Sequence, residues 1–245
     1  MTNPNQDQAE LNHFNQLATH WWDKNGPLKT LHDINPVRLS FVQKHQPLVG
    51  LRVLDIGCGA GIFSEALAKS GAQVTSIDLA EELIQVAQQH AKDSSLDIDY
   101  QCVSAENFAQ QHPAEFDVVV CMELLEHVPD PAAILAAASH CLAPQGWLFA
   151  STINQTFKAK ALAVWAAEHV LNLIPKGTHD ADKFIAPHQL VAWLEPLNFK
   201  PVTLTGLHYN PFKRTTQLAM PADINYLMAF QKMNEPKSTF ITSNK

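Results

Sequence analysis

The sequence predicts an α/β fold built on a doubly wound, mainly parallel sheet. Between residues 51 and 153, short apolar runs alternate with segments rich in helix formers, and a glycine cluster follows the first run. Apolar strands that alternate with helices form a parallel sheet with both faces covered and right-handed crossovers. The chain has 245 residues, enough for one large domain or two small ones, and no Gly/Ser linker interrupts it. We therefore expect a single domain over residues 1–245.

The elements of the core can be assigned in order along the chain. Apolar and β-branched composition predicts strands at residues 51–56, 73–78, 98–103, 116–122 and 146–153. Helix formers between these runs predict helices at residues 63–70, 81–92 and 132–142, and a short helix near Glu106. Together they define a core over residues 50–153.

An N-terminal arm precedes this core. Residues 1–49 are expected to be helical, with Asn35 as an N-cap and Pro36 as the first residue of a helix that continues through Arg38. After the fifth strand, residues 155–187 form an insertion that we expect to be a helical cap. Residues 188–245 are expected to add a helix at 190–197 and two antiparallel strands at 202–206 and 215–220, and the tail at 221–245 matches no known role.

Composition and charge exclude several classes of protein. Lys and Arg number 17 against 24 Asp and Glu, a formal charge of −7, and no basic run could follow a phosphate backbone, so nucleic acid is not an expected partner. Apolar residues make up 46% of the chain, too many for disorder, yet no apolar stretch approaches the roughly 18 residues that span a bilayer. The polar first residues and four widely spaced cysteines predict a cytoplasmic protein with reduced thiols.

A glycine-rich turn follows the first predicted strand, where open α/β sheets bind their ligands. Residues 55–61 read Asp-Ile-Gly-Cys-Gly-Ala-Gly, and glycine lets the backbone adopt positive φ and approach a ligand closely. Asp78 ends the second predicted strand, where its carboxylate can accept both hydroxyls of a ribose. Turn and carboxylate together indicate an adenosine-containing ligand.

Two observations favour S-adenosylmethionine over a dinucleotide. The dinucleotide pattern G-x-G-x-x-G would require glycine where this chain has Ile62. S-adenosylmethionine has no pyrophosphate and instead carries an ammonium and a carboxylate group, which Asp55 and Arg38 could address. An oxidoreductase and a non-catalytic sensor of an adenosine cofactor stay open as alternatives.

Several motifs resemble those of known methyltransferases. VLDIGCGAG, followed by VTSID, resembles the class I S-adenosylmethionine-dependent methyltransferases over about residues 50–153, which implies their Rossmann-like sheet. HWWDKNGPLKTLHDINPVRL, CMELLEHVPDP, PKGTHDADKFIAP and GLHYNP are similar to segments of the ubiquinone-biosynthesis O-methyltransferases, which act on polyprenylated dihydroxybenzenes. This resemblance implies O-methylation of a polyprenylated catechol or hydroquinone, with methylation of another small molecule or of a protein as the alternative. It also implies cofactor contacts from Arg38, Gly57, Asp78 and Met122; to these the glycine turn adds Asp55 and Gly59.

Glu123, Glu126 and His127 follow the fourth predicted strand, at the same rim as the glycine turn. At this spacing they would share one face of a helical turn. Methylating a phenol requires loss of a proton with a pKa near 10, and His127, tuned by Glu126, suits the role of base. The two carboxylates and the imidazole would also suit Mg²⁺ or another divalent cation, while a purely structural histidine stays an alternative.

The expected cap bears on how a lipid substrate is reached. Residues 156–174 are apolar nearly all the way round, so they either pack on the sheet or meet a prenyl tail and the membrane surface. We expect transient contact with the inner face of the membrane, and with other quinone-pathway enzymes. The acidic overall charge predicts that any such contact is weak.

Overall fold

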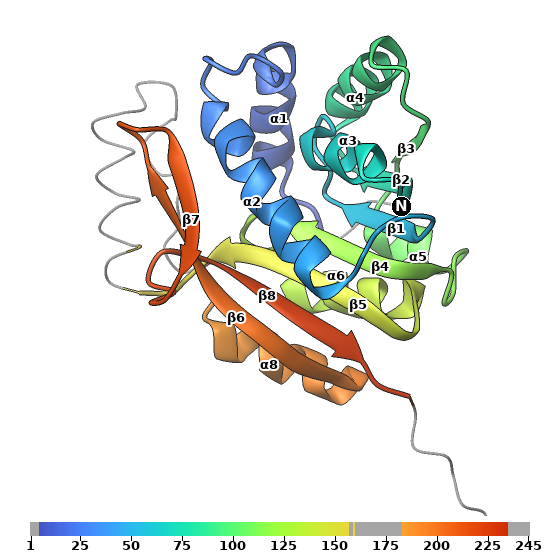
Figure 1. Ribbon diagram of the computed structural model, residues 1–245. Coiled ribbons are helices and arrows are strands. Elements are labelled where there is room, and N and C mark those ends of the chain that lie inside the picture. The colour runs from blue at the N-terminus through green and yellow to red at the C-terminus, as the bar shows by residue number, and fades with distance from the viewer. Residues whose placement is uncertain (1–4, 157–158, 160–182, 235–245) are drawn as a thin grey trace, which may run out of the picture.

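The computed structural model describes residues 5–156, 159 and 183–234 of the chain. One sheet of eight strands, in the order β3-β2-β1-β4-β5-β8-β6-β7, carries helices on both faces (Figure 1). Its first five strands pair in parallel, which confirms the predicted doubly wound sheet. They are Arg52–Ile56 (β1), Gln73–Asp78 (β2), Ile98–Cys102 (β3), Phe116–Met122 (β4) and Leu142–Ile153 (β5).

The order of the strands reverses between β1 and β4. From β1 the chain moves outward to β2 and β3, returns to β4 on the other side of β1, and continues to β5. Leu54 pairs with Val119 and Asp55 with Val120 across this junction. The carboxyl ends of β1 and β4 therefore open onto the crevice where such sheets bind ligands.

Helices cover the two faces of the parallel strands in separate layers. On β4, Val118 and Val120 are buried against α2 (Lys29–His45) and α3 (Ile62–Lys69). The alternate residues, Val119 and Cys121, pack with α5 (Ala105–Ala109) and α6 (Pro131–Cys141) on the opposite face. Because both faces are buried, the strand is apolar at every position except its polar second residue. Helix α4 (Glu81–Asp93) contacts β2 and β3.

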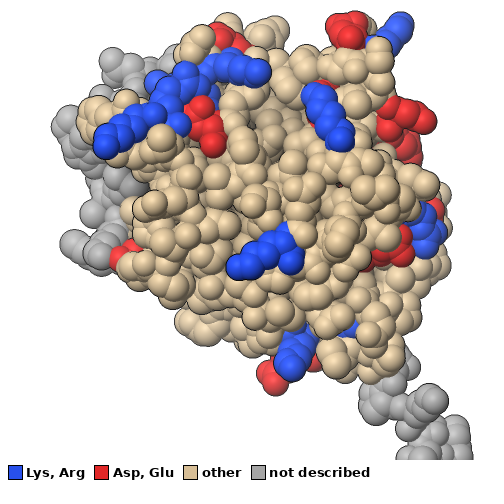
Figure 2. Space-filling model, viewed as in Figure 1, with Lys and Arg blue, Asp and Glu red and all other residues tan. Residues whose placement is uncertain are grey.

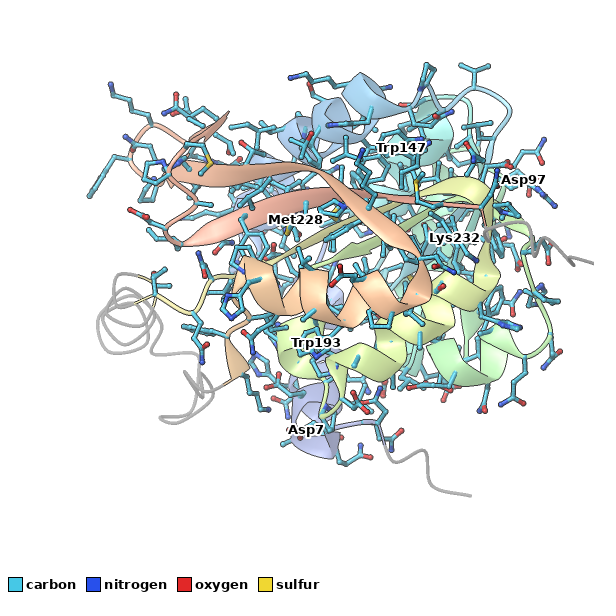
Figure 3. The ribbon with its side chains drawn as sticks, turned by 90° about the horizontal axis from the view of Figure 1, so that it is seen from below. Asp7, Asp97, Trp147, Trp193, Met228 and Lys232 are labelled. Carbon is cyan, nitrogen blue, oxygen red and sulfur yellow. The ribbon has the colours of Figure 1, made fainter. Side chains whose placement is uncertain are left out.

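Three antiparallel strands extend the sheet: β6 (Phe199–Asn210), β7 (Thr215–Ala219) and β8 (Asn225–Lys232). Two of them were expected, whereas β8 lies in the tail to which the sequence assigned no role. It is buried between β5 and β6, and Lys232 anchors its end by donating to the carbonyls of Ser139 and Leu142 at the end of α6. Figure 3 shows α8 (Pro187–Leu194), the helix that carries Trp193, lying along this part of the sheet.

The arm differs from the prediction at the start of α2. Helix α1 (Gln8–Leu17) comes first and is capped by Asp7. Helix α2 begins at Lys29, so the prediction that it starts at Asn35 and Pro36 was wrong. The Asn35 side chain instead donates to the carbonyl of Ile62 at 3.1 Å. Proline inside a helix removes one hydrogen bond, and here burial of apolar side chains on both sides of Pro36 holds the helix together.

The expected cap lies largely outside the described residues, so its helix at 156–174 and the proposed division of the chain into arm, core, cap and C-terminal region stay predictions. In the part of the chain that is described, no helix is both long enough and apolar enough to cross a membrane.

Candidate functional site

The glycine turn that follows β1 has a backbone conformation that side chains would block. Gly57 and Gly59 have φ of +74° and +54°, a region that L-residues other than glycine rarely adopt. A Cβ atom at Gly57 would lie 2.8 Å from the side chain of Leu124, and one at Gly59 would lie 2.5 Å from the ring of Trp21. The turn therefore depends on glycine both for its backbone shape and for the close approach of its neighbours.

Asp78 stands beside this turn at the end of β2. Its Oδ2 accepts a hydrogen bond from the Gly59 amide at 2.8 Å, and its Oδ1 accepts one from the Ala80 amide at 2.9 Å. Burial raises the pKa of Asp78, although these amides act against the shift. Each carboxylate oxygen keeps a second lone pair, so the side chain is fixed in place and can still accept hydroxyl groups.

Asp55 lies one residue before the end of β1, almost wholly buried. Its Oδ2 accepts a hydrogen bond from the Ser64 hydroxyl at 2.7 Å. Burial raises the pKa of Asp55 to about 7, and the charge of Asp78 adds to the increase. A carboxyl group in such surroundings favours a nearby cation, because a cation would offset the cost of its ionisation.

Arg38 brings a buried guanidinium from α2 to the same rim. Its Nη2 lies 3.1 Å from Oε1 of Glu123, and the side chain is only 5% exposed. Among the described residues, Nε of Arg38 finds no hydrogen-bond partner, and Nη2 meets Glu123 as an ion pair without hydrogen-bond geometry. Buried donors of this kind are costly unless they are satisfied, so the guanidinium fits the carboxylate of a ligand bound in the crevice.

Glu123 is held by several groups at the point where β4 ends. Besides Arg38, it accepts hydrogen bonds from the Ser151 hydroxyl at 2.8 Å and the Asn225 amide at 3.3 Å. Its φ of +54° turns the chain sharply before the short 3₁₀-helix Leu125–His127. The expected helical face shared with Glu126 and His127 is therefore not formed, because the chain turns between the first residue and the other two.

Glu126 and His127 have separate partners. Glu126 accepts a hydrogen bond from the Thr152 hydroxyl at 2.7 Å, and burial, reinforced by the charge of Glu123, raises its pKa to about 7. Nδ1 of His127 lies 3.2 Å from Oε2 of Glu10. Burial alone would lower the pKa of His127, but the hydrogen bond to Glu10 and the surrounding carboxylates raise it above its ordinary value.

The predicted metal ligands, Glu123, Glu126 and His127, do not converge on one point in this arrangement. Within the described residues, no three His, Cys, Asp or Glu side chains come together closely enough to hold a metal ion. Each of the three predicted ligands is instead bonded to a different protein group. The three-ligand set expected from the sequence is thus not formed.

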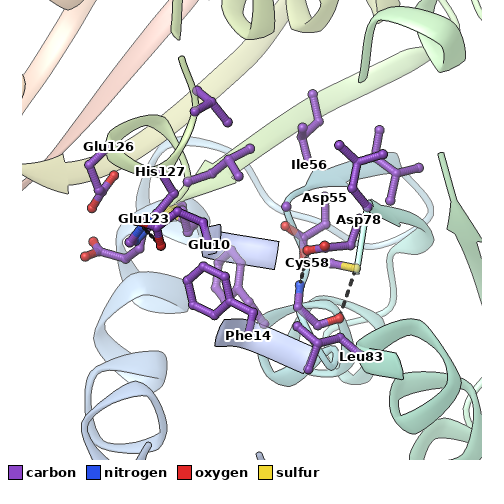
Figure 4. Close-up of a pocket in the computed structure, with 18 of the residues that line it drawn as sticks. Glu10, Phe14, Asp55, Ile56, Cys58, Asp78, Leu83, Glu123, Glu126 and His127 are labelled. Carbon is purple, nitrogen blue, oxygen red and sulfur yellow. Dashed lines mark hydrogen bonds and ion pairs between the residues drawn. The ribbon is translucent and has the colours of Figure 1, made fainter. Parts of the chain in front are cut away.

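One cleft of about 500 Å³ gathers all nine residues that the sequence singled out. In Figure 4, Asp55 and Asp78 lie on one side of the cleft, and Glu123, Glu126 and His127 on the other. The members shared by the prediction and the cleft lining are Arg38, Asp55, Gly57, Gly59, Asp78, Met122, Glu123, Glu126 and His127.

Sequence reasoning missed the contribution of the N-terminal arm to this cleft. Glu10, Phe14 and Trp21 line it, and Trp22 fixes the arm by donating to the carbonyl of Ala60 at 3.0 Å. The available signal was the spacing of Glu10 and Phe14, which places both on one face of a helix capped by Asp7. Nothing local indicated which part of the molecule that face would meet.

Comparison with known proteins identifies the family. Residues 11–204 match the model of a methyltransferase domain. A protein of Hydrogenovibrio crunogenus, named ubiquinone biosynthesis O-methyltransferase, is 48% identical over 93% of this chain and 95% of its own length. One of Xylella fastidiosa with the same name is 48% identical over 96% of both chains. The chain belongs to the family of ubiquinone biosynthesis O-methyltransferases.

Solved structures support the fold of this O-methyltransferase family member. Magnesium protoporphyrin IX methyltransferase from Synechocystis, determined with bound S-adenosylmethionine, superposes with a TM-score of 0.63 and 18% identity, over 94% of this chain and 100% of that one. A methyltransferase of Thermotoga maritima gives a TM-score of 0.67 at 14% identity, over 91% of this chain and 99% of that one. The Rossmann-like class I methyltransferase fold implied by the motifs is thereby confirmed.

Proposed function

We propose that this chain transfers the methyl group of S-adenosylmethionine to a hydroxyl of a polyprenylated catechol or hydroquinone in ubiquinone biosynthesis. The observation that carries the proposal is the cleft at the reversal of strand order, which joins a cofactor side to a proton-accepting side. Asp78 and Arg38 supply the first, and His127 the second. The names of its relatives support the choice of substrate class.

The cofactor side offers one protein group each for the ribose, the carboxylate and the ammonium of S-adenosylmethionine. We assign the ribose hydroxyls to Asp78, whose oxygens are fixed by two backbone amides. The buried guanidinium of Arg38, whose Nε has no hydrogen-bond partner among the described residues, suits the amino-acid carboxylate, and the raised pKa of Asp55 suits the ammonium. Met122, buried at the end of β4, adds an apolar contact. S-adenosylmethionine supplies a methyl group already activated by its positive sulfur.

His127 serves as the base on the substrate side. A phenolic hydroxyl has a pKa near 10, so a nucleophilic oxygen forms more readily when a neighbouring group takes the proton. The hydroxyl proton passes to the imidazole, the oxygen forms a bond to the methyl carbon, and the carbon–sulfur bond breaks with its electron pair going to sulfur. The raised pKa of His127 makes the imidazole a better acceptor. The apolar cleft walls hold oxygen and methyl in line and exclude water.

A methyl-transfer assay tests this function directly. The wild-type chain, S-adenosylmethionine and a short-tailed polyprenyl catechol are expected to give the mono-methyl ether, detected by mass spectrometry. The same lipid with both hydroxyls already methylated is the control. His127→Ala is expected to lower kcat about 100-fold or more while S-adenosylhomocysteine affinity, measured by calorimetry, changes little. Absence of product from the wild-type chain would reject the proposed function. Wild-type turnover of His127→Ala would reject the role of His127 as the base.

A divalent ion such as Mg²⁺ is a separate proposal, and no step above depends on it. Its support is Oε1 of Glu126, a buried oxygen with no hydrogen-bond partner among the described residues, and the chemistry of the nearby carboxylates. The separate partners of the predicted ligands speak against it. Loss of turnover after dialysis against EDTA, restored by Mg²⁺, would support an ion. Full turnover in EDTA, with no ion found by elemental analysis, would reject it.

We further propose that the protein acts in the cytoplasm and makes transient contact with the inner face of the membrane, where its lipid substrate lies, and with other enzymes of the pathway. The turn between β6 and β7 supports this, because Phe212 is 96% exposed there and Lys213 follows it. Figure 2 shows a group of basic side chains at the upper left of the view, near this turn, with an acidic side chain beside them. Flotation with phosphatidylglycerol vesicles tests the contact, and Phe212→Ser is expected to reduce it. Equal flotation of the wild-type chain and Phe212→Ser would show that Phe212 takes no part in the membrane contact.

A further inference from the structure

Helix α1 places two side chains against the ring of His127. Oε2 of Glu10 lies 3.2 Å from Nδ1 of His127. One helical turn later, the Phe14 ring meets the imidazole edge to face, with centroids 5.1 Å apart and planes at 86°. Figure 4 shows Glu10, Phe14 and His127 grouped on one side of the cleft. The imidazole therefore contacts a carboxylate and an aromatic ring from a segment more than a hundred residues earlier in the sequence.

The contact with Glu10 selects one tautomer of the neutral histidine. An ionised carboxylate only accepts hydrogen bonds, so Nδ1 must carry the proton that it donates to Glu10. The lone pair is then on Nε2, the nitrogen on the other side of the ring. His127 lines the cleft in which the substrate hydroxyl would bind.

Glu10 is itself held in place and kept ionised. Burial would raise its pKa, but the hydrogen bond and charge of His127 outweigh that effect and lower it. The Asp7 carboxylate caps α1 through the amides of Ala9 and Glu10, which fixes the helical turn that carries Glu10. Lys183 pairs with Asp7 at 3.2 Å and lies 3.8 Å from Oε1 of Glu10. The carboxylate is therefore oriented from both sides.

We propose that Glu10 is a positioning residue for methyl transfer: it holds His127 in the Nδ1–H tautomer and turns Nε2 toward the substrate hydroxyl. The proposal rests on the function proposed above, in which His127 is the base. It also makes completion of the site depend on docking of the N-terminal arm, because Glu10 reaches His127 only when α1 lies over the cleft.

Two variants separate the charge of Glu10 from its hydrogen bond. Glu10→Gln keeps an oxygen that can accept from Nδ1 but removes the negative charge, whereas Glu10→Ala removes both. We expect kcat to fall about 10-fold in the first and about 100-fold in the second. Glu82→Gln, on the exposed side of α4, is the matched control and should leave kcat unchanged. Calorimetry with S-adenosylhomocysteine should give similar affinities for all four proteins.

The pH profile is a readout that a purely structural role would not move. Activity should rise with pH as His127 loses its proton. The groups that face it are Glu10 on α1 and Glu123 and Glu126, which follow β4, with Lys183 beside Glu10. Removing the charge of Glu10 should move the acidic limb of the kcat profile to lower pH by about one unit in both variants. An unchanged limb in both would overturn the proposal.

Two further measurements keep the outcome decisive. Nitrogen-15 chemical shifts of His127 should report the Nδ1–H tautomer in the wild-type chain and its loss in Glu10→Ala. Sodium formate should restore part of the turnover of Glu10→Ala and none of that of His127→Ala. Wild-type kcat in both Glu10 variants, beside an inactive His127→Ala, would reject the positioning role alone. Wild-type turnover of His127→Ala would instead reject the base on which the role depends.

Discussion

Nη2 of Arg38 lies 3.1 Å from Oε1 of Glu123, inside the cleft and nearly shielded from solvent. The sequence placed these two residues in different sites, the first with the cofactor and the second with a metal ion. Their pairing explains how the Arg38 guanidinium can stay buried, since an uncompensated buried charge is strongly destabilising. It also keeps the cation at the cleft, where Nε still lacks a hydrogen-bond partner within the described residues.

Replacing Arg38 should weaken binding of the cofactor. Arg38→Met keeps the apolar stem and removes the donors, so we expect S-adenosylhomocysteine to bind about 10-fold to 100-fold more weakly, the worth of a charge-assisted hydrogen bond. Calorimetry measures the change. Arg52→Met, which removes an exposed arginine paired with Asp117 at 3.9 Å, is the control. Equal affinities for the two variants would exclude Arg38 from the cofactor site.

Asp78→Asn should also weaken cofactor binding, by at least about 10-fold, because the ribose hydroxyls lose a charged acceptor. The amide additionally turns N–H groups toward the backbone amides of Gly59 or Ala80, which now donate to this side chain. Asp99→Asn on the exposed side of β3 serves as comparison. If Asp78→Asn bound S-adenosylhomocysteine as tightly as the wild-type chain, the ribose would have to be held elsewhere.

The pKa of Asp55 predicts a pH-dependent stability for the protein without cofactor. Its value of about 7 in the folded state lies above the 3.8 of the unfolded chain, so the folded state binds the extra proton between those values. Stability therefore falls as pH rises from 3.8 to about 7, by about 4 kcal/mol from this group. Asp55→Asn should gain stability relative to the wild-type chain over the same range, measured by urea unfolding at pH 5 and pH 8. A stability difference between the two proteins that does not change with pH would contradict the raised pKa of Asp55.

Gly59 and Gly50 form a natural pair for testing the close approach of the arm. Both have positive φ, but a Cβ atom at Gly50 meets nothing within 4 Å, whereas one at Gly59 runs into Trp21 at 2.5 Å. Gly50→Ala should cost only backbone strain, about 1 kcal/mol. Gly59→Ala should cost about 2 kcal/mol more in urea unfolding, because the indole must move. Similar losses for the two variants would show that Trp21 does not pack against the turn.

Much of the fold followed from local patterns in the sequence. The five parallel strands, the helices between them and the glycine turn are each encoded within a few residues, by apolar periodicity and by backbone freedom. The strand β8 was missed because its buried run, residues 225–232, lies beyond the segments that the motifs covered. The predicted start of α2 was wrong because tertiary packing stabilises a helix that contains Pro36, whereas helix propensity alone predicts a helix end there.

The sequence by itself determined the cofactor side of the site: Asp55, Gly57, Gly59 and Asp78 must converge, because parallel strands bring their carboxyl ends to one edge. Only the tertiary structure decided the partners on the other side, where Glu10 meets His127 and Glu123 meets Arg38. These pairs join residues far apart in the chain. Their side chains meet because apolar faces of the arm dock on the core, and no local pattern records which surface a helix will cover.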